Sequence, residues 1–276
     1  MARRKYIIDE RRAAKFHKEG RGQGSGASYK PWLTIHDVPS IGRSHRLLGI
    51  STGRIHHFLS DLEHDLFLLL DWQSNTVDLR EQFPLELRAT LDIADRLNIR
   101  HPRVVSTPAQ AWIMTTDIVQ DIRGTNGIET RAYAVKTASD LEKSNTLQKL
   151  EIEWHYWQDQ GIPWKIITRA ELPQRMIDNI AWIRDFSSSH GLQCRSLELI
   201  PHFLEEIVAS PQLSVGKFCF DADTRYNLPS GSSLALMRHL LATREVTCDM
   251  EHVVLNVHLP FSSLKIGQQK QRRRRA

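Results

Sequence analysis

The sequence predicts a mixed α/β protein in two parts, a compact unit of about 170 residues followed by a smaller, mostly helical one. Helical and strand-like hydrophobic patterns alternate through the first part. From residue 171 onward the pattern changes to amphipathic helices. The chain has 276 residues, of which 41% are hydrophobic and 25% charged, so it is long enough for two hydrophobic cores.

The N-terminal stretch is basic and rich in glycine. Residues 7–18 are compatible with a basic helix that ends at Gly20. The run Gly20–Gly26 lacks the Gly-Lys-Ser/Thr of a phosphate loop, which favours a flexible or DNA-contacting segment over a nucleotide cradle. Residues 31–50 are expected to be extended with loops. They contain three candidates for phosphate contacts: Arg43, His45 and Arg46.

The first clear helix runs from Ser60 to about Trp72. Its apolar residues follow the spacing of a buried face: Leu59, Leu62, Leu66, Phe67, Leu69 and Leu70. Glu63 falls on that face, and two interpretations are open. It is either the acid of a capping box with Ser60 or a functional carboxylate, and the helix dipole would favour its ionised form in both cases.

The remaining elements of the first part follow in order. We expect a strand at 76–84, a helix at 85–97, a central hairpin, a long helix at 141–158 and a buried strand at 164–168. Four apolar residues of the long helix are expected in the core: Leu147, Leu150, Trp154 and Trp157.

The central hairpin carries an acid and a lysine. Its strands are the run Trp112–Val119 and residues 131–136, joined by a turn at Asn126-Gly127. A two-residue turn there would set Asp117 directly opposite Lys136, with the facing side chains roughly 5 Å apart. Strand alternation places Asp117 on a buried face, where a carboxylate needs a partner or a metal. A plain salt bridge is the alternative.

The second part is predicted as helices followed by a small hairpin. Helices are expected from Glu171 through Phe186, over 197–209 and over 234–241, and the strands at 246–250 and 253–259. This order suits a winged-helix-like module. Two residues of the apolar last helix, Arg238 and His239, either read DNA or have a mainly protein-binding or structural role.

Charge is distributed unevenly along the chain. Residues 1–50 hold 11 lysines and arginines against four acids, and 265–276 hold six and no acid. Because the net charge is +5, the stretch 51–264 carries −8. Basic ends around an acidic middle fit a protein that grips a polyanion and holds carboxylates centrally, although a solvated arm and tail would give the same pattern.

Composition excludes several classes of protein. No run of about 18 apolar residues is present, so no membrane span is expected. The first ten residues lack an apolar stretch and a cleavage site, which argues against secretion. Cys194, Cys219 and Cys248 lie far apart without CxxC spacing, so neither a disulfide framework nor a zinc site is expected. A cytoplasmic protein is the expectation.

Convergence of Glu63 and Asp117 would create a site for a divalent metal. Mg²⁺ suits two carboxylates because it takes oxygen ligands, keeps waters and binds phosphate. A metal there would polarise a phosphodiester, and a nearby lysine would orient water or stabilise developing charge.

Several stretches taken in order carry a family resemblance. They are Lys18–Gly24, Pro31–Thr34, Gly42–Arg46, His56-His57, Leu59–Glu63, Asp78–Leu85, Thr116-Asp117 and Val135-Lys136. On these the chain resembles, over nearly its whole length, the TnsA family of endonuclease subunits of heteromeric transposases. The resemblance implies a restriction-endonuclease-like mixed-sheet catalytic domain at 1–170. It also implies a winged-helix-like DNA- or partner-binding domain at 171–276 with a basic tail.

The resemblance also implies site residues. Glu63 and Asp117 match the metal-binding acids of the family, and Lys136 matches its catalytic lysine. The position two before the lysine is often acidic in restriction enzymes and polar in a typical TnsA, but here it is Ala134. A third ligand for Mg²⁺, or for Mn²⁺ as its substitute, would come from the backbone, most plausibly the Val135 carbonyl.

The activity implied is cleavage of the 5′ strands of double-stranded DNA at transposon ends. The implied partners are a TnsB-type transposase and a TnsC-type AAA+ ATPase, with no membrane. The alternative is a non-catalytic DNA-binding adaptor that docks the transposase and its ATPase regulator, and Ala134 is the feature that favours it.

Overall fold

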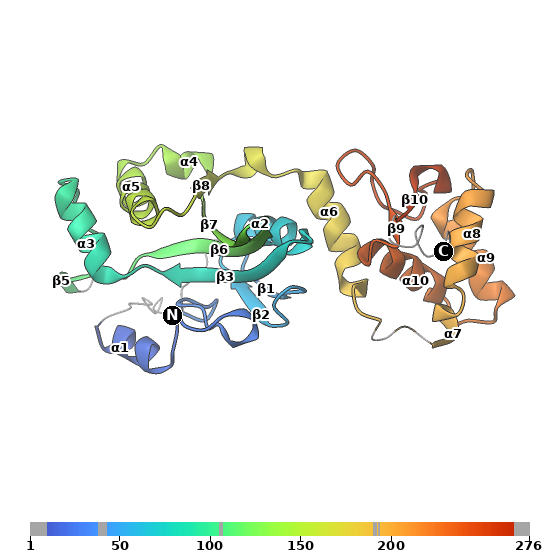
Figure 1. Ribbon diagram of the computed structural model, residues 1–276, viewed down its shortest axis with the longest axis horizontal. Coiled ribbons are helices and arrows are strands. Elements are labelled where there is room, and N and C mark those ends of the chain that lie inside the picture. The colour runs from blue at the N-terminus through green and yellow to red at the C-terminus, as the bar shows by residue number, and fades with distance from the viewer. Residues whose placement is uncertain (1–9, 38–42, 105–106, 190–191, 193, 268–276) are drawn as a thin grey trace, which may run out of the picture. The chain divides into compact units, whose positions relative to one another are not determined.

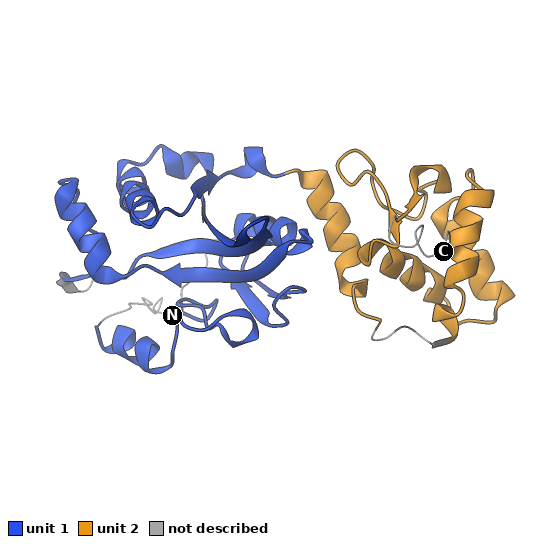
Figure 2. Cartoon of the chain, viewed as in Figure 1, with its two compact units in different colours: residues 1–172 blue, residues 173–276 orange. Residues whose placement is uncertain are grey.

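The computed structural model describes residues 10–37, 43–104, 107–189, 192 and 194–267. The chain divides into two compact units, unit 1 (Met1–Leu172) and unit 2 (Pro173–Ala276), coloured separately in Figure 2. Residues 7–9 of the expected first helix, Gly42 and the tail from 268 lie outside the described residues.

A four-stranded mixed sheet forms the centre of unit 1 (Figure 1). Its order is β3 (Thr76–Pro84), β6 (Thr115–Gly124), β7 (Gly127–Val135) and β8 (Trp164–Ile167). The first three strands are antiparallel, whereas β8 runs parallel to β7. A parallel pair needs a crossover, and α4 and α5 supply it. The strands expected at 76–84 and 164–168 are confirmed.

Helices of unit 1 pack around this sheet. They are α2 (Asp61–Trp72), α3 (Leu87–Arg96), α4 (Ala138–Leu141) and α5 (Ser144–Gln158). One core cluster joins α3, α5, β6 and β7: Leu85, Ile93, Ala94, Met114, Val119, Ala132, Ile152 and Trp157.

The helix expected over 141–158 differs in two ways. It is interrupted between α4 and α5, where Lys143 has an extended backbone. Leu147 and Trp154 were expected in the core but are 47% and 38% exposed. The buried face of α5 instead follows Leu150, Glu153 and Trp157, a spacing of three and four residues.

Smaller elements complete unit 1. They are α1 (Glu10–Lys18), η1 (Gly26–Ser28), β1 (His45–Leu48), β2 (Ile55–Phe58), β4 (Arg103–Val104), β5 (Thr107–Ala111) and η2 (Arg169–Glu171). The glycine-rich segment forms a hydrogen-bonded turn. The amide of Gly22 donates to the Lys30 carbonyl at 2.6 Å. A Cβ on Gly22 (φ +77°) would lie 2.2 Å from Pro84 Cγ, so only glycine lets the turn pack against the end of β3.

Unit 2 is helical. It contains α6 (Gln174–Ile183), η3 (Arg184–Phe186), α7 (Cys194–Leu197), α8 (Ile200–Ala209), α9 (Val215–Arg225), α10 (Ser232–Ala242), β9 (Val246–Thr247), η4 (Phe261–Ser263) and β10 (Lys265–Ile266). The sequence did not predict α9. The expected hairpin of 246–250 with 253–259 is wrong, because β9 pairs with β10 and residues 253–259 form no strand.

Arg238 and His239 have the structural role that was one of the two interpretations. Arg238 Nε donates to the Trp182 carbonyl at 2.7 Å, and its guanidinium lies over the Trp182 and Phe186 rings. His239 Nδ1 lies 2.6 Å from the Phe186 carbonyl oxygen. Both side chains therefore tie α10 to α6 and η3.

None of the helices in the described part of the chain combines the length and hydrophobicity that a membrane crossing requires.

Candidate active site

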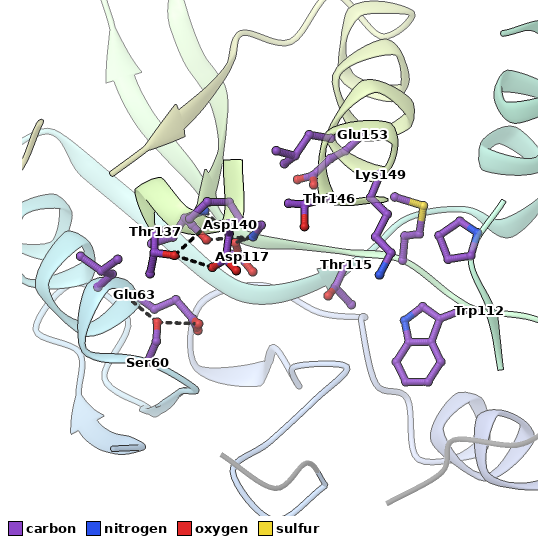
Figure 3. Close-up of a pocket in the computed structure, with 16 residues that line it drawn as sticks. Ser60, Glu63, Trp112, Thr115, Asp117, Thr137, Asp140, Thr146, Lys149 and Glu153 are labelled. Atoms are coloured by element: carbon purple, nitrogen blue, oxygen red, sulfur yellow. Dashed lines mark hydrogen bonds and ion pairs between the residues drawn. The ribbon is translucent and has the colours of Figure 1, made fainter. Parts of the chain in front are cut away.

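Ser60 caps α2, but the Glu63 carboxylate contacts the Leu59 amide and the Ser60 hydroxyl rather than the Ser60 amide that a capping box would use. The Glu63 amide donates to Ser60 Oγ at 3.2 Å, which caps α2. Its carboxylate accepts from Ser60 Oγ at 2.9 Å and from the Leu59 amide at 3.0 Å, so it also anchors the residues before the helix. The same carboxylate lines a hollow of unit 1 (Figure 3).

The hairpin of β6 and β7 has a different register from the one expected. Gly124 pairs with Gly127, so the loop is Thr125-Asn126 rather than Asn126-Gly127. Gly127, which the prediction placed in the turn, is the first residue of β7 and has φ +132°. Continuing this register sets Asp117 opposite Ala134, with Lys136 diagonal to it.

Asp117 and Lys136 nevertheless meet. The register differs from the expected one by two residues, so strand alternation leaves both side chains on the same face. Lys136 Nζ lies 2.7 Å from Asp117 Oδ2. The Val135 amide donates to the same oxygen at 2.7 Å, which fixes the carboxylate at the point where the strands stop pairing.

The four residues predicted as metal ligands or catalytic lysine, Glu63, Asp117, Val135 and Lys136, line one hollow of about 460 Å³. In Figure 3 the labelled Glu63 and Asp117 lie near one another at one end, whereas Lys149 and Trp112 lie at the other. The lining residues are Ser60, Leu62, Glu63, Pro102, Trp112, Met114, Thr115, Asp117, Val135, Lys136, Thr137, Asp140, Thr146, Lys149, Leu150 and Glu153.

Burial and mutual repulsion govern the charges in this hollow. Burial, with the Asp117 charge added, raises the pKa of Glu63 to about 7, so it outweighs the stabilisation of the ionised form at a helix start. Burial alone would lower the pKa of Lys136. The neighbouring Asp117, Glu153 and Glu63 outweigh it and raise that pKa above its ordinary value, which keeps the lysine charged.

Two further carboxylates line the hollow, Asp140 and Glu153, and neither was predicted as a site residue. Glu153 is the buried one. It comes from α5 and accepts from Thr116 Oγ1 at 2.7 Å and Trp164 Nε1 at 3.1 Å. Burial, followed by the Asp117 charge, raises its pKa to about 7. Its spacing to Leu150 and Trp157 was the available signal, because an acid on an apolar helix face needs an explanation.

Gln82 was also missed. It is buried, and its backbone has φ +47°, which is strained for a residue with a Cβ. The pairs on either side of it set Gln82 opposite Asp117 in the sheet. Its side-chain amide lies 3.4 Å from Glu63 Oε2, and its side-chain oxygen accepts from Thr115 Oγ1 at 3.2 Å. No local sequence pattern indicates such a conformation.

The oxygen atoms at this end of the hollow suit a hard divalent cation. Lys136 Nζ lies 2.7 Å from Asp117 Oδ2 and 2.8 Å from the Val135 carbonyl, so these two oxygens already converge on one positive charge. Glu63 adds a carboxylate destabilised by a like charge, which a cation would relieve. The Ala134 methyl is fully buried and offers no ligand. Within the described ranges no three His, Cys, Asp or Glu side chains cluster as metal ligands.

The basic candidates near α2 lie apart from these carboxylates. His45 Nε2 lies 2.6 Å from Asp61 Oδ1, and Arg43 Nε lies 3.6 Å from the same oxygen. Neither residue lines the hollow, nor does Arg46.

Comparison with known proteins defines the class to which this fold and site belong. The profile of the TnsA-like endonuclease N-terminal domain matches residues 73–169, and the profile of the TnsA endonuclease C-terminal domain matches residues 171–250. The chain belongs to the TnsA-like endonuclease family.

One relative is the transposition protein TnsA of transposon Tn7 from Escherichia coli. It is 39% identical over 244 residues, which cover 88% of this chain and 87% of that protein.

Proposed function

We propose that the chain is a metal-dependent endonuclease that cleaves the 5′ strands of DNA at transposon ends during cut-and-paste transposition. The observation that supports it most is the convergence of Glu63, Asp117 and Lys136 in one hollow. Membership of the TnsA-like family supports nuclease activity on DNA. A restriction-endonuclease-like catalytic domain is consistent with the mixed sheet, and a winged-helix-like unit 2 with helices that end in a short β-ribbon.

Asp117, Glu63 and the Val135 carbonyl would hold the Mg²⁺ in this proposal. When bound, the ion would offset the charge of the scissile phosphate and make water a stronger nucleophile. The chain's own groups do the rest. The Val135 amide orients the Asp117 carboxylate, Ser60 and Leu59 orient that of Glu63, and the Lys136 ammonium supplies positive charge beside the reacting phosphate.

The proposed partners are a TnsB-type transposase and a TnsC-type AAA+ ATPase. A subunit that cuts only one strand at each end needs a second activity for the other strand. The support for these partners is the relation to a transposition protein of Tn7.

The second candidate function is a non-catalytic adaptor that binds DNA and docks the transposase. The buried Ala134 methyl favours it, because that side chain removes one possible ligand.

A strand-specific nicking assay on transposon-end DNA, with the partner transposase and Mg²⁺ present, separates the two functions. The proposal expects 5′-strand cleavage by the wild type and its loss in Asp117→Ala. Equal 5′-strand products from both proteins would favour the adaptor.

A further inference from the structure

A second hollow adjoins the candidate active site in unit 1. It has a volume of about 390 Å³ and is lined by Arg100, His101, Pro102, Arg103, Val104, Asn145, Gln148 and Lys149. Pro102 and Lys149 line both hollows, so the two are neighbours with a shared wall. The Lys149 side chain extends from α5 into the candidate active-site hollow, at the end away from Glu63 (Figure 3). We call this second space the basic hollow.

The lining of the basic hollow carries positive charge alone. Arg100, Arg103 and Lys149 are cations, and no Asp or Glu is among the described residues that line it. Asn145 and Gln148 add side-chain amides, which donate hydrogen bonds. This is a local exception within the stretch 51–264, whose net charge is −8.

His101 shapes the basic hollow rather than adding charge to it. Its imidazole is buried, with Nε2 3.1 Å from Thr90 Oγ1 and Nδ1 2.9 Å from the Pro102 carbonyl. Burial lowers the pKa of His101, and the nearby Arg103 lowers it further. The ring is therefore neutral near pH 7, so the charge of the hollow comes from its arginines and lysine.

Three separate segments bring the cations together. Arg100 follows α3, Arg103 begins β4, and Lys149 lies in the middle of α5. Ile93 of α3 and Ile152 of α5 belong to the same core cluster, which fixes these helices relative to each other. The segments that carry Arg100 and Lys149 are thus held by one hydrophobic core.

Arg100 and Lys149 differ from other cations nearby, which form salt bridges. Arg96 pairs with Asp159 at 2.9 Å and Lys143 with Asp140 at 2.7 Å. Within the described part of the chain, neither Arg100 nor Lys149 forms a salt bridge or a side-chain hydrogen bond. Both side chains are exposed and line the basic hollow.

We propose that the basic hollow is a phosphate subsite that binds a backbone phosphodiester of the DNA strand whose scissile phosphate lies at Asp117. The inference rests on the proposed function. Guanidinium groups bind phosphate oxygens in a two-bond geometry, and an ammonium at the shared wall spans adjacent phosphates. Such contacts set the position of the strand and carry no base specificity. The subsite thus selects which phosphodiester reaches the carboxylates.

Salt dependence of DNA binding tests the subsite without any cleavage. The full chain in EDTA is titrated against duplex DNA over a series of salt concentrations, as wild type and as the triple variant Arg100→Ala/Arg103→Ala/Lys149→Ala. The control is Lys165→Ala, which removes an exposed lysine of β8 that does not line the basic hollow. Lys165 pairs with Tyr133, whose side chain lies on the opposite face of the sheet from that of Ala134. The plot of the logarithm of the DNA-binding constant against the logarithm of the salt concentration has a negative slope. Its magnitude should decrease by about 0.9 for each phosphate that the variant no longer neutralises.

The expected result is a shallower slope for the triple variant and an unchanged slope for Lys165→Ala. Equal slopes for all three proteins, an equal fall in triple variant and control, or no binding by the wild type at the lowest salt would each overturn the subsite. Nicking of transposon-end DNA by the wild type, measured separately with the partner transposase, tests the proposed function. If the wild type nicks DNA but all three proteins have the same slope, the proposed function stands and the subsite is refuted. If the triple variant has a shallower slope but the wild type does not nick, the subsite stands and the proposed function is refuted.

Discussion

Lys136 Nζ lies 2.7 Å from Asp117 Oδ2, although the sheet register sets Asp117 opposite Ala134 and leaves the lysine on the diagonal. The long lysine side chain spans this offset. The Val135 amide holds the same carboxylate oxygen from the backbone. The contact thus lies at the point where β6 and β7 stop pairing.

Asp117→Asn should abolish nicking while keeping the fold. The Asn side-chain oxygen can still accept from the Val135 amide, so the change removes a charge and little volume. We expect a loss of about 100-fold or more in the single-turnover rate with the partner transposase. Because the Asp117 charge raises the pKa of Glu63, that pKa should fall in the variant, as carboxyl-labelled NMR would show. Asp121→Asn, on the same strand but outside the hollow, is the control, and a similar loss there would contradict the assignment.

The hydrophobic spacing of the sequence sufficed to predict Glu63 on the buried side of α2 and the strands β3 and β8. It also predicted Asp117 and Lys136 on one face of the hairpin. That prediction is confirmed, although the predicted turn was wrong. An error of two residues preserves the face of a strand, whereas an error of one would have separated the pair. The sequence therefore predicted the face of each side chain correctly but not the pairing register of the strands.

Other features depend on contacts that no local pattern records. Gln82 takes a positive φ because the chain around it is fixed by β6 on one side and by the Trp32 amide, which donates to its carbonyl at 3.1 Å. The pairing of β9 with β10 joins segments 18 residues apart, so alternation near 253 was misleading. Glu153 shares the buried face of α5 with Leu150 and Trp157, which were predicted in the core, whereas Leu147 and Trp154 are exposed.

Gln82→Gly and Gln82→Ala should differ in stability. Glycine adopts φ +47° without strain, whereas alanine keeps the strain and loses the same hydrogen bonds to Glu63 and Thr115. We expect Gln82→Gly to be more stable than Gln82→Ala by about 1 kcal/mol in urea unfolding. Both should nick more slowly than the wild type if the amide positions Glu63. An alanine variant as stable as the glycine variant would show that the backbone relaxes.

Glu153→Gln should change how stability depends on pH. Burial raises the pKa of Glu153 from 4.5 in an ordinary carboxyl to about 7. The folded protein keeps this proton where the unfolded chain has lost it, so the contribution of Glu153 to stability is full below pH 4.5 and falls as the pH rises to about 7. Glutamine still accepts from Thr116 and Trp164 without titrating. In EDTA, the loss of unfolding free energy between pH 4.5 and pH 8 should be smaller in the variant by about 2–3 kcal/mol. Equal losses in both proteins would mean that Glu153 is ionised throughout.

Arg238→Ala should destabilise unit 2 without changing which DNA sequence is bound. The guanidinium donates to the Trp182 carbonyl and covers the Trp182 and Phe186 rings, so its removal takes a donor from a partly buried carbonyl and uncovers aromatic surface. We expect a loss of about 2 kcal/mol in urea unfolding followed by a fluorescence signal from Trp182. Arg238→Lys should recover only part of it, since an ammonium cannot make the same planar contacts. Arg225→Ala, at the exposed end of α9, is the control and should stay within about 0.5 kcal/mol of the wild type. If Arg238 read bases instead, its loss would relax sequence preference at one position of the DNA and leave the unfolding curve unchanged.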